Sequence, residues 1–178
     1  MSGPGRQEGL SGREGPSGRE GLWAFSLRVY AAPGVADWCL GLQEDLGADV
    51  NLLLWCAWAG GHGIRLAEGD IAAGEAAVAP WRQGVVAPLR QIRRLLKADL
   101  GAISAEMATA LRTRVKAVEL EAERVEQAAL EVVALPPGAV GGTAAASAVA
   151  ANVALYLGGL GAAETAADTL VAAVMKQR

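Results

Sequence analysis

The feature that most constrains the fold is a stretch of ten uncharged residues, Val50–Ala59, which reads VNLLLWCAWA. Its only strongly polar side chain is that of Asn51, and its two tryptophans, Trp55 and Trp58, offer large apolar areas for burial. Asp49 precedes the stretch as a candidate N-cap, and glycines follow it as a stop signal. We therefore predict a central buried helix inside a small helical domain.

The first 21 residues differ in composition from the rest of the chain. They contain SGREG twice, they are rich in Gly, Ser and paired Arg and Glu, and Leu10 is their only apolar side chain besides Met1. Such a segment buries too little surface to offset the entropy lost on ordering. We therefore predict a disordered tail over residues 1–21 and one all-α domain over residues 22–178.

Helical spacing of apolar residues continues on both sides of the central stretch. Residues 22–31 carry apolar side chains on both faces, which predicts a well-buried helix, and a second helix is expected over Pro33–Gly47. A weaker pattern predicts a short helix within Arg65–Ala77. The uncharged run at 139–157 is rich in Ala and Gly, so we expect a buried helix there rather than a membrane span. An Ala-rich helix at 164–176 closes the chain.

Two longer helices are predicted in the middle of the chain, over about Pro80–Lys97 and over residues 102–135. Pro80 is expected to begin the first, because proline suits a first turn, and Pro88 is expected to kink or restart it. A turn about Gly101 would join the two into a long antiparallel hairpin. The predicted fold is all-α, an array of six to eight helices with this hairpin as its long arm.

The second long helix carries the strongest periodic signal in the chain. Apolar residues recur every four and three positions along it, which predicts one buried face. This face consists of Ile103, Met107, Leu111, Val115, Val118, Ala122, Val125, Ala129 and Val132. Basic residues cluster early in the helix and acidic residues late, which is the reverse of the order that the helix dipole favours. With a turn about Gly101, Arg82 would lie opposite Glu119, and we expect a charge contact between them.

Polar residues beside the central helix form one candidate site. The candidate ligand-binding residues are Trp38, Gln43, Asp49, Asn51, Trp55 and Trp58. A carboxylate and two amides between aromatic walls could hold a small ligand. The competing interpretation is that Asp49 and Asn51 cap the helix while the tryptophans pack in the core.

A second candidate surface is a basic face on the first long helix. It consists of Arg82, Arg90, Arg93, Arg94 and Lys97. Such a face suits an acidic helix of another protein, a phosphate-bearing ligand or an anionic membrane surface, although most charged faces are only solvated. The net charge of −3 and the lack of aromatic residues among these bases make no strong case for nucleic acid. Another protein is the expected partner, and peripheral membrane contact and self-association stay open.

The sequence offers few residues for catalysis or metal binding. His62 is the only histidine, and in its Gly-rich loop we expect a flexible surface side chain. Together with Cys39 and Cys56 it matches no zinc-site spacing, and the GxGxxG and P-loop motifs are missing. We therefore predict no catalytic residue, no metal and no cofactor. Both cysteines lie in apolar runs and no apolar signal segment precedes them, which favours buried thiols in the cytoplasm.

Four separated motifs make the chain resemble a known family. They are LWAFSLRVYAAPGV, CLGLQEDLGADVNLLLWCAW, WRQGVVAPLRQIRRLLK and ELEAE, which occur in this order within residues 22–130. The family is a conserved group of small, mainly proteobacterial proteins without a known activity. The resemblance implies a bacterial, soluble, helical protein, and it assigns no functional residue.

These observations favour a binding protein over an enzyme. We expect a non-enzymatic helical interaction or adaptor protein that binds another protein through the basic face or the long charged helix. The alternative is a small-molecule-binding protein or an enzyme with a Trp-lined pocket around the central helix.

Overall fold

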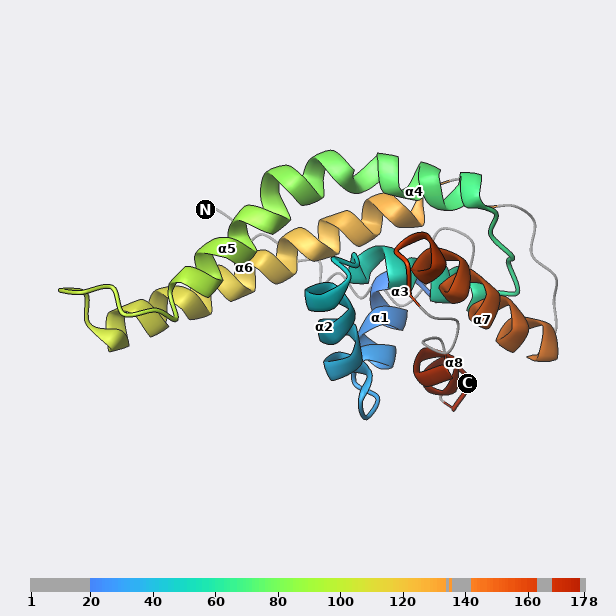
Figure 1. Ribbon diagram of the computed structural model, residues 1–178, viewed down its shortest axis with the longest axis horizontal. Coiled ribbons are helices and arrows are strands. Elements are labelled where there is room, and N and C mark those ends of the chain that lie inside the picture. Colours follow the sequence, from blue (N-terminus) through green and yellow to red (C-terminus); the bar gives the residue numbers. More distant parts are fainter. Residues whose placement is uncertain (1–19, 134, 136–141, 163–167, 177–178) are drawn as a thin grey trace, which may run out of the picture.

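The computed structural model describes residues 20–133, 135, 142–162 and 168–176. These residues form eight α-helices, one π-helical turn and no β-strand, so the fold is all-α as predicted (Figure 1). The helices are α1 (Leu22–Tyr30), α2 (Val35–Asp45), α3 (Val50–Gly61), α4 (Glu68–Trp81), α5 (Ala87–Leu95), α6 (Ala105–Glu131), α7 (Gly142–Gly159) and α8 (Asp168–Lys176), and the π-helical turn η1 (Arg82–Val86) joins α4 to α5. The predicted disordered tail lies outside the described residues up to residue 19. Its last two residues are described, and there Glu20 pairs with Arg28 while Gly21 is buried.

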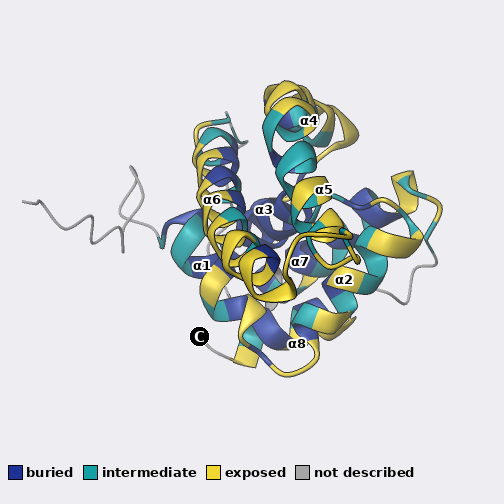
Figure 2. Ribbon diagram, turned by 90° about the vertical axis from the view of Figure 1, so that its left-hand side faces the viewer, coloured by how far each residue is buried: buried dark blue, intermediate teal, exposed yellow. Residues whose placement is uncertain are grey.

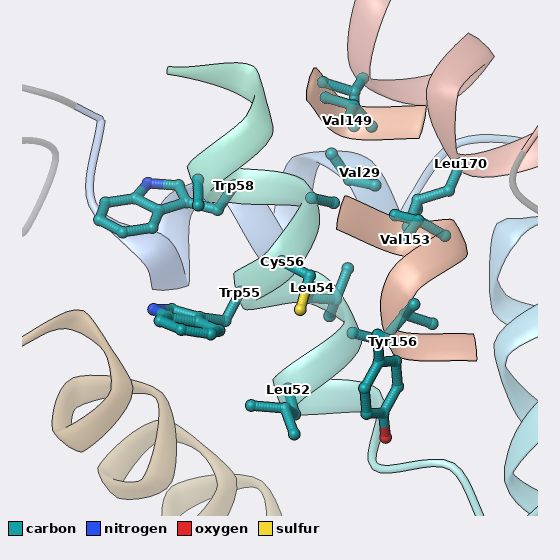
Figure 3. Close-up of a cluster of buried hydrophobic side chains, with 14 of the residues drawn as sticks. Val29, Leu52, Leu54, Trp55, Cys56, Trp58, Val149, Val153, Tyr156 and Leu170 are labelled. Carbon is teal, nitrogen blue, oxygen red and sulfur yellow. The ribbon is translucent and has the colours of Figure 1, made fainter. Parts of the chain in front are cut away.

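Helix α3 lies at the centre of the molecule, as the sequence predicts. Every residue from Asn51 to Gly61 is buried, and Asp49 caps the helix with Oδ1 accepting hydrogen bonds from two backbone amides. Figure 3 shows Trp55 and Trp58 on one side of α3 and the valines of α7 on the other. A Cβ atom on Gly60 would lie 2.5 Å from the Cα atom of Val149. The glycine therefore lets the backbones of α3 and α7 approach more closely than any side chain would allow.

Helix α7 contains most of the uncharged run at 139–157, whose first three residues lie outside the described part. It packs along α3, and Val149, Val153 and Leu157 are buried in the core. The buried Asn152 donates to the carbonyls of Cys56 and Ile64 and accepts from the amide of Leu66, over distances of 2.9–3.1 Å. The expected buried helix is thus confirmed. Among the described helices, none has the length and apolar character that a bilayer crossing requires.

The elements α4, η1 and α5 follow one another without a loop, which corrects the prediction of a new helix at Pro80. Pro80 lies inside α4, which is longer than the short helix expected within Arg65–Ala77. The proline removes one backbone donor, while Trp81 beside it anchors the helix by donating from Nε1 to the carbonyl of Ala122. The expected restart at Pro88 is confirmed, because α5 begins at Ala87 directly after η1. The Pro88 ring would meet the carbonyl four residues earlier, and the wider turn η1 lies there.

Helices α5 and α6 form the predicted antiparallel hairpin, which projects from the rest of the molecule as a long arm (Figure 1). Ser104 caps α6 by accepting a hydrogen bond from the amide of Met107. The expected contact of Arg82 with Glu119 is wrong, because Glu119 pairs with Arg90 and Arg93 of α5 instead. Arg82 pairs with residues of the domain body, and because Arg90 and Arg93 follow it by eight and eleven residues, the helices meet about two to three turns out of the predicted register.

The predicted buried face of α6 is also wrong for most of its length. Six of its nine residues are between 47 % and 74 % exposed, namely Ile103, Met107, Leu111, Val118, Val125 and Val132. The face that packs inward is more polar, with Glu119, Ala122, Glu126, Gln127 and Leu130. Arginine and asparagine side chains on other helices bind this polar face, while the arm extends beyond any core that could cover the apolar one. Helix α1 deviates in the same way, because Leu27 and Tyr30 are exposed.

Candidate functional site

The polar centre of the molecule is Asp49, at the junction of α2 and α3. Its Oδ1 atom caps α3, at 2.8 Å from the amide of Asn51 and 3.3 Å from that of Leu52. Its Oδ2 atom accepts a hydrogen bond of 2.7 Å from Arg82 Nη1. The amide of Asp49 donates over 2.7 Å to the hydroxyl of Tyr156, which comes from α7. Asp49 therefore joins three separate parts of the chain.

Arg82 stands at the start of η1 and bridges two carboxylates. Besides Asp49, it contacts Glu75 of α4 with both terminal nitrogens, of which Nη1 lies 2.9 Å from Oε2. Hydrogen bonding to Glu75 is the largest cause that raises the pKa of Arg82, and the charge of Asp49 adds to it. The guanidinium is thus a fixed positive charge between α3 and α4.

Glu126 of α6 lies on the other side of Asp49. It is only 1 % exposed, and its Oε2 atom accepts a 2.9 Å hydrogen bond from Asn51 Nδ2. Gln127 Nε2 donates to the Oδ1 atom of the same asparagine at 2.9 Å. Burial raises the pKa of Glu126 from its usual 4.5 to about 8, and both the charge of Asp49 and hydrogen bonding with it add to the rise. Glu126 is therefore mostly protonated near neutral pH, although its Oε1 atom has no hydrogen-bond partner.

Two pockets flank this centre, and Asp49 and Arg82 line both. The smaller has a volume of about 270 Å³ and is also lined by Gln43, Asn51, Arg90, Arg94 and Glu126. The larger, of about 660 Å³, has apolar walls from α3, α4 and α7 and carries Glu68, Glu75 and Tyr156 as polar groups. The smaller pocket brings together residues from the predicted ligand site and from the predicted basic face, which lie more than thirty positions apart in sequence.

None of the three predicted tryptophans lines either pocket. Trp55 is fully buried, Trp58 donates from Nε1 to the carbonyl of Glu20 at 2.7 Å, and Trp38 packs against the core from its edge. The competing interpretation therefore holds for the tryptophans. Asp49 is a cap as well as a pocket residue.

The predicted basic face divides into two parts. Arg82, Arg90 and Arg93 turn toward acidic residues, and the 2.9 Å contact of Arg90 Nη2 with Glu123 Oε1 is one of these ion pairs. Arg94 and Lys97 are exposed, and neither forms an ion pair with another residue in the part of the chain that the structure describes. Only the end of the face near the arm tip is therefore free for a partner.

The exposed apolar residues along one side of α6 and its two ends form a second candidate surface. We call it the α6 stripe: Ile103, which precedes the helix, Met107, Leu111, Val118 and Val125 on it, and Val132, its C-cap. Figure 2 shows the exposed side of α6 turned away from α3. The last four of these residues are spaced by seven positions. At that spacing side chains stay on one face of a helix, so these four side chains form a row about six turns long.

The cysteines, His62 and the possible metal ligands lie as follows in the structure. Over residues 20–133 and the other described segments, no group of three or more His, Cys, Asp and Glu side chains is placed to hold a metal ion. Cys39 and Cys56 are free and buried, and burial raises the pKa of Cys39 to about 12. His62 is not the flexible surface residue that we expected, because its ring packs edge-on against Trp58 with centroids 5.0 Å apart.

Comparison with known proteins identifies the family. A family model described as "Protein of unknown function (DUF2390)" matches residues 21–130. The chain belongs to this family. The match spans α1 through nearly all of α6, so it includes α3 and the arm, whereas α7 and α8 lie beyond it. Searches among curated proteins and among solved structures found no match.

The sequence did not single out Glu75, Glu126, Gln127 or Tyr156 as site residues. Glu126 and Gln127 sit in a long helix with many charges, where nothing marks a buried carboxyl group. Tyr156 gave the clearest available signal, because it is one of few polar side chains in an otherwise uncharged helix. A hydroxyl in such a helix needs a buried partner.

Proposed function

We propose that this protein is a non-enzymatic helical interaction or adaptor protein that binds a helix of another polypeptide through the α6 stripe. The observation that carries the proposal is the exposure of six large apolar side chains along one side of α6 and its two ends. A run of this kind is unusual on a surface exposed to water, and it marks interaction sites.

The spacing of the stripe indicates what kind of partner fits it. Leu111, Val118, Val125 and Val132 recur every seven residues, so they form a row along one side of the helix against which another helix could pack. Covering each side chain would contribute on the order of 1 kcal/mol, because each is about half exposed. At the arm tip, the free bases Arg94 and Lys97 would favour acidic residues in the partner. The fitting partner is therefore an amphipathic helix with apolar residues at seven-residue intervals.

A photo-crosslinking amino acid at position 125 tests the proposal. We expect adducts whose crosslinked peptide maps to one helical segment with this spacing. The matched control places the same crosslinker at Thr113, which is exposed on another side of α6. Equal adducts from both positions, or none from position 125, would contradict the proposal.

The setting that we propose for this interaction is the bacterial cytoplasm. The resemblance to proteobacterial proteins supports the bacterial part. The two free, buried cysteines support a reducing compartment.

A second candidate function is the binding of a small molecule in the 270 Å³ pocket. The observation that favours it is the buried, unpartnered Oε1 atom of Glu126 in the wall of that pocket. Arg94 lines the same pocket without an ion pair among the described residues. A compact molecule with an N–H group that donates to Glu126 Oε1 and an anionic group for Arg94 matches these two groups.

Thermal denaturation with a panel of free amino acids tests the second candidate. At ten times its dissociation constant, a true ligand should raise the melting temperature by about 3 to 6 °C. The rise should vanish in the Arg94→Ala variant and persist in Lys97→Ala, whose base lies outside the pocket. A panel that leaves the melting temperature unchanged would remove this candidate.

A further inference from the structure

We infer that the partner helix on the α6 stripe is α6 of a second copy of this chain, which lies antiparallel with a two-fold axis at Val118. The inference rests on the proposed function and names the occupant of the same surface. It depends on three features of α6: the symmetry of its apolar spacing, the order of its charges and the accessibility of the face.

The apolar residues are arranged symmetrically about Val118. Leu111 lies seven residues before it and Val125 seven residues after it, and all three side chains are exposed. In an antiparallel pair centred on Val118, Leu111 of one copy meets Val125 of the other, and Val118 meets its own counterpart. Such an interface uses one patch twice, as two-fold symmetry requires.

The charges of the stripe follow the same symmetry. Arg114 lies four residues before Val118 and Glu121 three residues after it, both are exposed, and both fall on the side of α6 that carries the stripe. Neither forms an ion pair with another described residue. Antiparallel packing places Arg114 of each copy beside Glu121 of the other, whereas parallel packing would oppose like charges.

Of the late acids of α6, Glu119 and Glu123 pair with arginines of α5 and Glu126 is buried, so Glu121 is the acid that this pairing uses. The two helix dipoles would also oppose each other, which is favourable.

The large apolar side chains of the stripe are exposed, while Ala122, one turn after Val118, is buried. The inward side of α6 holds Glu119 and Glu126, about 80–100° around the helix from Val118, and they contact α5 and α3. Figure 1 shows the arm extending away from α1, α2 and α8, so its outer half has no neighbour within the chain among the described residues. A second arm could therefore approach without displacing the body of the domain.

Disulfide trapping of the full chain tests whether the two-fold axis lies at Val118. In the Val118→Cys variant, two Cα atoms facing each other across packed helices would lie within the roughly 4.4–6.8 Å that a disulfide spans. Mild oxidation should convert most of this variant to a covalent dimer. Thr113→Cys, exposed on another side of α6, should stay monomeric. The native cysteines do not interfere, because both are buried. Equal dimer yields from the two variants would overturn the inference.

Exchanging the charges at positions 114 and 121 tests whether the two α6 helices pack antiparallel. Arg114→Glu and Glu121→Arg should each weaken self-association by about tenfold at low salt, because each replaces two attractive contacts by two repulsive ones. The double variant restores both contacts and should associate within about twofold of the wild type. A double variant as weak as the single ones would overturn the antiparallel arrangement.

The crosslinker at position 125 separates the two proposals. Adducts to α6 of the same chain support both. Adducts confined to a different protein overturn the self-pairing and leave the proposed function standing, and the loss of all stripe-specific adducts overturns both.

Discussion

Replacing Glu126 by glutamine should remove a pH-dependent loss of stability that the wild-type protein suffers in mildly basic solution. Burial beside Asp49 raises the pKa of Glu126 from 4.5 to about 8. At a pH between these two pKa values, the Glu126 side chain of the folded state holds a proton that the unfolded state has released. The free energy of unfolding therefore falls as the pH rises. Each pH unit between the two pKa values changes it by about 1.4 kcal/mol.

The magnitude follows from this pH range. Between about pH 5 and pH 8 the wild type should lose on the order of 3 kcal/mol through this one group, whereas glutamine stays neutral throughout. The glutamine keeps the size of the side chain, and its carbonyl oxygen can still accept from Asn51. Asp49 and Arg82, the charged neighbours of Glu126, remain in both proteins, so the comparison isolates the effect of the Glu126 carboxyl group.

Thermal denaturation of both proteins at several pH values is the assay. The melting temperature of the wild type should fall relative to that of Glu126→Gln by about 6 to 12 °C from pH 5 to pH 8. A constant difference between the two proteins across this range would show that Glu126 titrates normally and would refute the reasoning.

Three further predictions concern contacts that hold the site and the core. Arg82→Met leaves Asp49 facing no cation and should lower the free energy of unfolding by about 2 kcal/mol in urea titrations, with the loss shrinking at high salt. Gly60→Ala forces a methyl group into the backbone of α7 and should cost about 3 kcal/mol or more, whereas Gly41→Ala, with nothing within 4 Å, should stabilise the protein by about 0.5–1 kcal/mol. Asn152→Ala strands two buried carbonyls and one amide, and should cost about 3 kcal/mol and speed hydrogen exchange in the 64–66 loop.

The elements themselves could largely be predicted from the sequence. An uncharged stretch with a capping aspartate and glycines behind it has few alternatives to a buried helix, and α3 is one. The restart at Pro88 follows from the chemistry of proline. Pro80 was wrongly predicted to begin a helix. A proline inside a helix is tolerated when the neighbouring turns are held in place, and the hydrogen bond from Trp81 to α6 holds them here.

The orientation of α6 could not be predicted, because periodicity identifies a face and not what covers it. The apolar stripe was the stronger pattern, and a core was the natural assumption. The helix instead buries Glu119 and Glu126, which find arginine and asparagine partners on other helices. Such pairing is invisible in one sequence, since it depends on which helices meet and in which register.

The candidate site was only partly accessible for the same reason. Asp49 was identified from its place before α3, and its role as a cap follows from sequence. Its contacts with Arg82 and Tyr156 join positions 33 and 107 residues away, which only the tertiary structure brings together. The tryptophans were plausible pocket walls because they are large and aromatic. The same property favours packing against the core, and neither pocket is lined by one.

The most direct test of the α6 stripe as an interface between copies is sedimentation equilibrium over a hundredfold range of protein concentration. The wild-type chain should rise from the mass of one chain to that of two, while Val118→Glu should stay at one across the range and keep the same helical circular dichroism. A wild-type protein that sediments as a single chain at every concentration would contradict the account.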